Sequence, residues 1–222
     1  MANPGKKILL VDNYRSERTK SIEQIESAIK QAGYQVDTIR HSDAATAIKS
    51  GTDILNGYHG SVSSGSGKTW QKTGKTDKQG NDYVVSNDTV HEHLTSHEKP
   101  LYAICGGYHA LAQSLGYKVT NTGEFNRGKG EDGQHYNHKY GLAAEETADG
   151  KVKNVETINH AGKEYVKSFD YENKRGVQYH PERTEIGRQE LTDFLKKNVD
   201  NSGGKAKTIK LYQGDNYQSK AA

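Results

Sequence analysis

The only cysteine of the 222-residue chain, Cys105, stands between a short apolar run and two glycines in the stretch YAICGGYH, residues 102–109. A strand, a nucleophile, small residues and a helix in this order form a nucleophile elbow, whose tight turn requires small neighbours such as Gly106 and Gly107. The first turn of a helix favours a thiolate because its free N–H groups and its dipole are positive there. A buried structural cysteine before a glycine turn is the alternative interpretation of this stretch.

A second stretch, GVQYHPE at residues 176–182, places a histidine and a carboxylate directly after an apolar run. Pro181 forces the chain out of the predicted strand just after His180, and Glu182 follows. A cysteine nucleophile needs a base, and the base needs an acceptor that fixes its tautomer and orientation. Because the carboxyl ends of parallel strands share one edge of a sheet, Cys105, His180 and Glu182 are predicted to converge there as a catalytic triad.

The elements that must position these residues alternate along the first half of the chain. Short apolar runs predict strands, and helical spacing with start and stop signals predicts helices. The predicted strands are 7–11, 34–39, 53–55 and 102–104, and the predicted helices are 16–31, with Ser16 as N-cap, 84–96 and 106–116. This alternation indicates a three-layer α/β fold, with a mostly parallel central sheet and helices on both faces.

The second half of the chain is predicted to add short antiparallel strands and one helix. The strand-like pieces are 117–120, 152–158, 164–169 and 176–179, and the helix is 184–197. One domain over residues 1–199 is expected, because this length supports a single sizeable α/β core. Residues 60–82 are rich in Gly, Ser, Lys and Thr and are predicted to form an inserted surface loop, and residues 200–222 a polar tail.

The two motifs resemble the signatures of class I glutamine amidotransferases of the triad type. That family carries G-I-C-x-G-x-Q at its elbow and G-V-Q-F-H-P-E at its closing motif, where this chain has AICGGYH and GVQYHPE. The resemblance extends over residues 6–197 and implies a flavodoxin-like fold. GEFNRG (123–128) and TEIGRQELTDFL (184–195) are similar to the glutaminase of GMP synthase, whereas NYRS (13–16) is similar to anthranilate synthase component II.

The resemblance also implies where the oxyanion and the substrate are held. DILNGYHGS (53–61) stands where the family carries the glycine-rich loop S-G-G-P-G-S, so Gly57 and Tyr58 are expected beside Gly106 at the oxyanion. His109 stands where most members have a glutamine near the bound substrate. The changes at Tyr58 and His109 are expected to affect substrate affinity more than the triad.

The activity that the resemblance implies is the hydrolysis of glutamine. Cys105 attacks the side-chain amide, and His180, oriented by Glu182, protonates the departing ammonia. Ammonia then passes to a separate ATP-dependent synthetase subunit, with that of GMP synthase as the first candidate, and no cofactor is implied. Two alternatives stay open: a non-catalytic binding or regulatory protein on the same scaffold, and a stand-alone hydrolase of γ-glutamyl compounds.

Composition argues against several other classes of protein. The net charge of +3 is small and spread along the chain, so nucleic acid is not expected as the main partner. The apolar run near the N-terminus is too short for a signal peptide or a membrane span, so no membrane association is expected. A single cysteine cannot form an internal disulfide, which fits a reducing, cytoplasmic setting.

Two further motifs compete with this interpretation. SSGSGKT (63–69) resembles the end of a P-loop but lacks the first glycine of that motif, so no nucleotide site is expected. HEHLTSH (91–97) could present His93 and His97 on one helical face as metal ligands, but solvent-facing histidines are commoner, and no metal is expected. His135 and His138 receive no assignment.

Overall fold

The computed structural model describes residues 5–14, 19–66, 72–76, 82–86 and 88–200. Its strands are β1 (Lys7–Asp12), β2 (Gln35–Arg40), β3 (Gly60–Ser63), β4 (Lys72–Thr76), β5 (Asp82–Val85), β6 (Leu101–Ile104), β7 (Val119–Lys129), β8 (His135–Ala143), β9 (Lys153–His160), β10 (Lys163–Tyr171) and β11 (Lys174–Val177). Its helices are α1 (Lys20–Gln31), α2 (His41–Lys49), α3 (Thr89–Ser96), α4 (Gly106–Ser114) and α5 (Glu185–Val199), with short 3-10 turns η1 (Ala144–Thr147) and η2 (Pro181–Arg183).

Within the described residues the strands form one mixed sheet in the order β2-β1-β3-β6-β11-β10-β8-β7-β5-β4, and β9 pairs with β10 off this path. The pairs among β2, β1, β3, β6 and β11 are parallel, and the pairs from β10 outward are antiparallel. The register aligns Ser63 with Ala103 and Val177 with Ile104. The carboxyl ends of β3, β6 and β11 therefore lie at one edge of the sheet.

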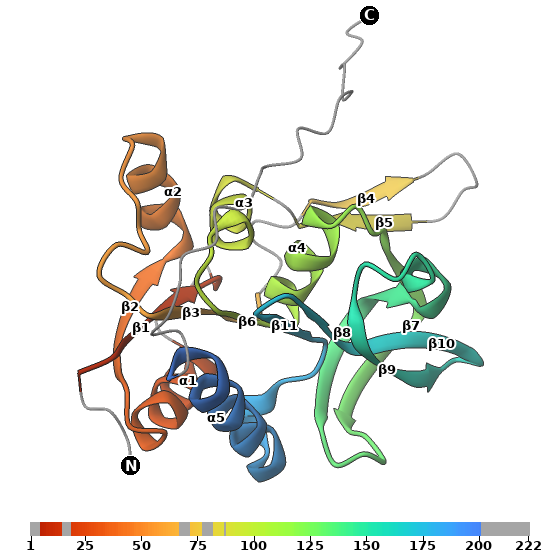
Figure 1. The fold of residues 1–222 in the computed structure, drawn as a ribbon. Coiled ribbons are helices and arrows are strands. Elements are labelled where there is room, and N and C mark those ends of the chain that lie inside the picture. The colour runs from red at the N-terminus through yellow and green to blue at the C-terminus, as the bar shows by residue number, and fades with distance from the viewer. Residues whose placement is uncertain (1–4, 15–18, 67–71, 77–81, 87, 201–222) are drawn as a thin grey trace, which may run out of the picture.

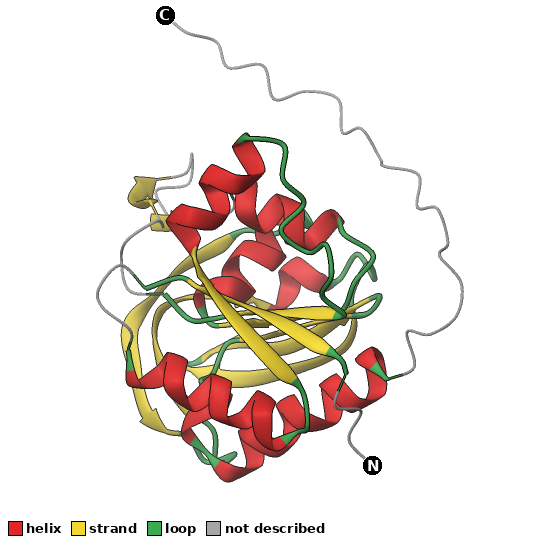
Figure 2. Cartoon of the chain, turned by 90° about the vertical axis from the view of Figure 1, so that its left-hand side faces the viewer, coloured by secondary structure: helices red, strands yellow, loops and turns green. Residues whose placement is uncertain are grey.

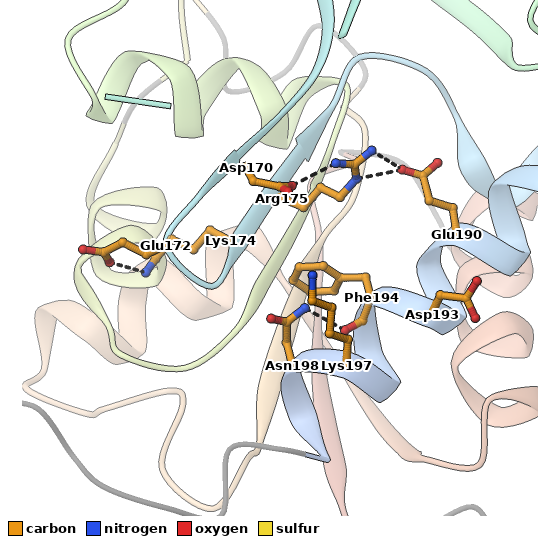
Figure 3. Close-up of a pocket in the computed structure, with 9 residues that line it drawn as sticks. All are labelled: Asp170, Glu172, Lys174, Arg175, Glu190, Asp193, Phe194, Lys197 and Asn198. Atoms are coloured by element: carbon orange, nitrogen blue, oxygen red, sulfur yellow. Dashed lines mark hydrogen bonds and ion pairs between the residues drawn. The ribbon is translucent and has the colours of Figure 1, made fainter. Parts of the chain in front are cut away.

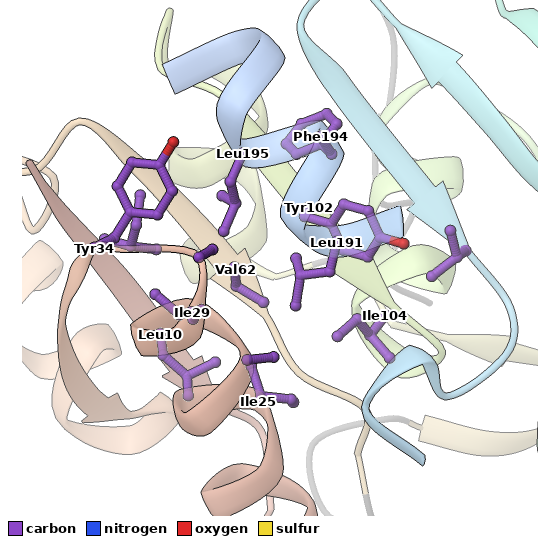
Figure 4. Close-up of a cluster of buried hydrophobic side chains, with 14 of the residues drawn as sticks. Leu10, Ile25, Ile29, Tyr34, Val62, Tyr102, Ile104, Leu191, Phe194 and Leu195 are labelled. Carbon is purple, nitrogen blue, oxygen red and sulfur yellow. The ribbon is translucent and has the colours of Figure 1, made fainter. Parts of the chain in front are cut away.

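Helices cover both faces of the parallel part of the sheet (Figures 1 and 2). In β1, Ile8 and Leu10 pack in the cluster shared with α1 and α5, which Figure 4 shows, while Leu9 and Val11 pack in the cluster shared with α2, α3 and α4. Burial on both faces explains why this strand is a continuous apolar run. The predicted three-layer α/β fold is confirmed. No helix among the described residues is long and apolar enough to span a membrane.

The prediction of a surface loop over residues 60–82 is wrong at its start. Gly60–Ser63 is the buried strand β3, paired on both sides by β1 and β6. Val62 is its only large apolar side chain, and its serines are buried with polar partners, so the strand carries no hydrophobic pattern. Residues 72–76 form β4, whereas residues 67–71 and 77–81, like residues 201–222 of the predicted tail, lie outside the described residues.

Side chains of aspartate explain two further corrections. The predicted strand at 53–55 is a turn, because the Asp53 carboxylate accepts a hydrogen bond from the Leu55 N–H at 3.0 Å. The helix predicted over 84–96 begins only at Thr89, because the side chain of Asp88 caps it, and Val84 and Val85 belong instead to β5.

Other boundaries and elements also differ from expectation. Helix α1 is capped by Thr19, while the predicted cap, Ser16, lies outside the described residues. The sequence pattern does not predict helix α2 or strand β8. Ala44 is the one fully buried residue of α2, and the outer part of the β7–β8 hairpin is exposed, with Phe125 56% exposed. Neither element therefore shows a clear apolar period.

Candidate active site

Cys105 occupies the sharp turn between β6 and α4. It is the N-cap of α4, with φ 46° and ψ −97°, a left-handed conformation that is strained for any residue other than glycine. The glycines after it allow two close approaches. A Cβ on Gly106 would lie 2.2 Å from Ser66 Oγ, and one on Gly107 would lie 2.6 Å from Ser63 Oγ. The geometry is that of a nucleophile elbow, with the thiol buried at the first turn of a helix.

His180 and Glu182 reach the same edge of the sheet from the end of β11. The Nδ1 of His180 lies 2.9 Å from Oε1 of Glu182, and the N–H of His180 donates to the carbonyl oxygen of His135 at 2.7 Å. Both side chains are almost fully buried. The structure thus brings Cys105, His180 and Glu182 together, and the carboxylate holds the imidazole with its Nε2 available for the sulfur.

The electrostatics of this group favour a protonated imidazole at His180. Burial acts to lower the pKa of His180, but the charge and hydrogen bond of Cys105, and then those of Glu182, outweigh it and raise the pKa to about 10. Burial acts to raise the pKa of Glu182, but the hydrogen bond and charge of His180 outweigh it and lower that pKa. At neutral pH the imidazole of His180 is therefore protonated and lies beside the Glu182 carboxylate.

The loop that faces this triad is residues 64–66, directly after β3. A Cβ on Gly65 would lie 2.8 Å from His180 Cε1 and 2.9 Å from the hydroxyl oxygen of Tyr14, so only glycine fits there. The side-chain amide of Asn13 donates to the carbonyl oxygen of Ser64 at 2.7 Å and fixes the start of the loop. Sequence reasoning missed this loop. The signal that could have found it is the Gly- and Ser-rich stretch SSGSG, which otherwise resembles only an incomplete P-loop.

The expectation that Gly57 and Tyr58 lie at the oxyanion is wrong. They precede β3, so they lie at the amino edge of the parallel strands, opposite Cys105. The hydroxyl of Tyr58 donates to the Asp37 carboxylate at 2.8 Å, and Nζ of Lys7 lies 5.7 Å from the centre of its ring. Because Lys7 begins β1, these contacts hold the turn before β3 and have no part in the site.

His109 lies beside the site, but it contacts another side chain of the closing motif. Its Nε2 is 3.2 Å from the carbonyl oxygen of Tyr140 and 2.9 Å from Oε1 of Gln178. A carbonyl oxygen only accepts, so Nε2 carries the proton. Gln178 therefore turns its oxygen to His109 and its NH₂ group to the sulfur of Cys105, at 3.8 Å. Burial lowers the pKa of His109 to about 4, so this imidazole stays neutral at neutral pH.

Replacing Gln178 with leucine is expected to slow alkylation of Cys105 by iodoacetamide several-fold, up to about tenfold, at neutral pH. The variant loses the hydrogen bond that Gln178 donates to the Cys105 sulfur, worth on the order of 1.5 kcal/mol. His109→Leu should have a smaller effect of the same sign, because Gln178 is then free to turn. His109→Gln, which keeps an N–H donor, is the matched control and should retain the wild-type rate. Equal rates in all four proteins would contradict this role.

Three more aromatic side chains surround the triad without an assignment from the sequence. The ring of His135 lies 6.4 Å from that of His180. Burial, followed by repulsion from His109, lowers the pKa of His138 to about 3. Burial, and then the charges of Glu182 and Cys105, raise the pKa of Tyr14 well above its usual value. These groups stay neutral at neutral pH, so among these four described side chains the positive charge beside the sulfur is the imidazolium of His180.

The charged pocket in Figure 3 lies away from this site. Its cavity is about 220 Å³ and opens at the amino end of β11, where Lys174 pairs with the start of β6. Arg175 bridges Asp170 at 2.8 Å and Glu190 at 2.7 Å. Because its charges already compensate one another, we assign this pocket a structural role in joining β10, β11 and α5.

Comparison with known proteins relates the fold to solved structures. No protein-family model matches the sequence, and no curated protein has a significantly similar sequence. A protein from Thermoplasma acidophilum, provisionally assigned as one of the subunits of GMP synthase, is 17% identical with a TM-score of 0.59 over 88% of this chain and 94% of its own. A glutamine amidotransferase from Thermotoga maritima is 15% identical with a TM-score of 0.56 over 89% of this chain and 99% of its own. The chain therefore has the fold of class I glutamine amidotransferases.

Proposed function

We propose that this chain is a glutaminase of the class I glutamine amidotransferase type, which releases ammonia from glutamine through Cys105, His180 and Glu182. The observation that carries the proposal is the strained conformation of Cys105 at the start of α4, at the edge where the hydrogen-bonded pair of His180 and Glu182 also lies. Strain of this kind at a turn persists where the surrounding structure enforces it, and it is concentrated at functional sites.

The first half of the reaction forms a thioester. The thiolate of Cys105 attacks the side-chain carbonyl carbon of glutamine, and the carbonyl oxygen becomes an oxyanion. Backbone N–H groups of Gly106 and of the loop at Gly65 and Ser66 are the donors placed to stabilise it, because the loop approaches Gly106 closely. His180 then gives its proton to the leaving nitrogen, the C–N bond breaks, and ammonia departs.

The second half returns the enzyme to its starting state. His180, now neutral, takes a proton from a water molecule that attacks the thioester carbon. The C–S bond breaks, glutamate leaves, and the thiolate and imidazolium are restored. Glu182 keeps the imidazole in one orientation through both halves, since its bond to Nδ1 leaves Nε2 directed at the sulfur.

The ammonia acceptor that we propose is a separate ATP-dependent synthetase subunit of the GMP synthase type. The stretches GEFNRG and TEIGRQELTDFL support this branch, as does the fold shared with the Thermoplasma protein. One observation favours a second candidate, a hydrolase of γ-glutamyl compounds. His109 is committed to Gln178 and Tyr140 and does not replace the glutamine that amidotransferases hold near their substrate.

Ammonia release from L-glutamine, with and without a synthetase of the GMP synthase type and the substrates of that enzyme, tests the proposal. We expect release with the chain and an increase when the synthetase is present. Hydrolysis of a γ-glutamyl anilide, without any response to the synthetase, would instead support the second candidate. No turnover of either compound, together with no labelling of Cys105 by an electrophilic glutamine analogue, would support a non-catalytic protein.

Gly106→Ala is expected to lower the turnover number about a hundredfold. Its new Cβ would meet Ser66 Oγ at 2.2 Å and Ser66 N at 3.0 Å, so the loop must move and its oxyanion donors with it. Tyr58→Phe is the matched control, because it removes only the bond to Asp37 at the other edge of the sheet. Its turnover should stay within about twofold of wild type. A large loss of turnover in Tyr58→Phe would instead support the first expectation, that Gly57 and Tyr58 lie at the oxyanion.

A further inference from the structure

Helices α2 and α3, which lie side by side on one face of the sheet (Figure 1), bring together two imidazoles and one carboxylate. His41 is the first residue of α2, Asp88 is the N-cap of α3, and His91 lies in the first turn of α3. His41 Nε2 is 2.6 Å from Asp88 Oδ2, and His91 Nδ1 is 3.0 Å from Asp88 Oδ1. One ligand atom from each residue lies within 4.8 Å of those of the other two.

We propose that His41, Asp88 and His91 form a binding site for a divalent transition-metal ion such as Zn²⁺. Two imidazoles and one carboxylate are a ligand set typical of zinc and of its neighbours in the first transition row, and unlike the all-oxygen sets of Mg²⁺ and Ca²⁺. With ligand bonds of about 2.0–2.1 Å, a tetrahedral ion holds its ligands about 3.3 Å apart. The present separations reach that value through movements of less than about 1 Å.

The groups behind these ligands are also arranged as a metal site requires. The Asp88 carboxylate accepts the backbone N–H groups of Val90 and His91 at 3.0 and 3.1 Å, which fixes it in the cap position. The second nitrogen of His91, Nε2, lies 3.1 Å from Ser63 Oγ. A hydrogen bond to the far nitrogen sets the tautomer in which Nδ1 faces the ion.

The site combines a buried and an accessible side. The side chain of His91 is 2% exposed, whereas those of His41 and Asp88 are 18% and 30% exposed. A metal ion can therefore enter from solvent, and water can supply the fourth ligand. Because His41 lies on α2 while the other two ligands belong to α3, a bound ion would join the two helices. It would stabilise the folded chain, which alone presents the complete site.

A neighbouring cluster, the one that the sequence motif indicated, is a weaker ligand set. His93 and His97 both approach the carboxylate of Asp53, at 2.9 and 3.6 Å, but that carboxylate is 47% exposed. Helix α3 and the residues at its ends thus contribute to two similar groups, of which the second is the more exposed. The second serves as an internal control for histidines that bind metal without a built site.

The test uses the full chain without a polyhistidine tag, freed of metal by a chelator and titrated with Zn²⁺ and with Co²⁺. We expect one ion per chain, a visible Co²⁺ spectrum of a tetrahedral nitrogen and oxygen site, and a rise in melting temperature with Zn²⁺. His41→Ala and Asp88→Asn should each weaken binding by at least about tenfold, and the asparagine side chain of the second variant can still cap the helix. The double variant His93→Ala/His97→Ala should bind as wild type does.

Two outcomes would overturn the site. One is no saturable binding by the wild-type chain at about 100 μM metal, which would leave the three residues as a hydrogen-bonded group only. The other is binding that survives His41→Ala or that disappears in the His93→Ala/His97→Ala variant. Labelling of Cys105 by a glutamine analogue is measured in the same preparations. It reports on the proposed glutaminase site independently of metal binding, so the failure of one proposal can be told apart from the failure of the other.

Discussion

Cys105→Ala is expected to abolish ammonia release from glutamine, with a loss on the order of 10⁶-fold relative to wild type. No other thiol exists in the chain that could replace the nucleophile, and residual binding of substrate cannot form the thioester. The measurement is single-turnover ammonia release, together with mass spectrometry after treatment with an electrophilic glutamine analogue. Wild type should gain one adduct, at Cys105, and the variant none.

Folding is the control for this variant. Alanine carries a Cβ as cysteine does, so both meet the same strain at φ 46°, and the melting temperature of the variant should stay close to that of wild type. A variant that is folded and inactive then reports on the chemistry alone. Ammonia release at even about one hundredth of the wild-type rate in the folded variant would exclude Cys105 as the nucleophile.

The parts of the site that the sequence predicted are those attached to apolar strands. Tyr102–Ile104 and Val177 are buried in the centre of the sheet, so their pattern placed the ends of β6 and β11, and with them Cys105, His180 and Glu182. Parallel pairing then brings the two ends to one edge without any further information. The motifs and the apolar strands that precede them indicate the same positions, which is why these residues could be predicted from the sequence.

The loop that we propose for the oxyanion, residues 64–66, could not be placed in this way because the strand before it, β3, is built from small polar residues. Ser61 and Ser63 can be buried because their hydroxyl groups form hydrogen bonds, the first with the carbonyl oxygen of Pro100 and the second with Nε2 of His91. Both partners come from distant segments of the chain. A strand stabilised by tertiary hydrogen bonds leaves no period of apolar residues to detect. Because β3 has no apolar pattern, the resemblance of DILNGYHGS to the glycine-rich loop of the family suggests a position for the oxyanion loop that is too early, at Gly57 and Tyr58. The metal site proposed above also joins separate segments, α2 and α3.

His180→Asn is expected to lower the turnover number by a factor approaching that of losing the nucleophile. Asparagine neither accepts a proton from water nor gives one to the leaving nitrogen. Glu182→Gln should cost less, by about a factor of ten to a hundred, because the base remains and only its orientation and charge are disturbed. The measurement is steady-state ammonia release by all three proteins. Turnover by His180→Asn close to that of wild type would rule out the triad.

The raised pKa of His180 predicts how the stability of the fold changes with pH. The pKa of His180 in the folded chain, about 10, lies above its ordinary value of 6.5, so the protonated ring stabilises the fold. That contribution is complete below about pH 6.5 and is lost as the pH rises toward 10. The difference in unfolding free energy between wild type and His180→Asn should therefore shrink by a few kcal/mol across this range. It should shrink much less when both proteins also carry Cys105→Ala, because the thiolate is the strongest group that raises this pKa. A difference that stays constant from about pH 6.5 to 10 would show that the pKa of His180 is not raised in the folded chain.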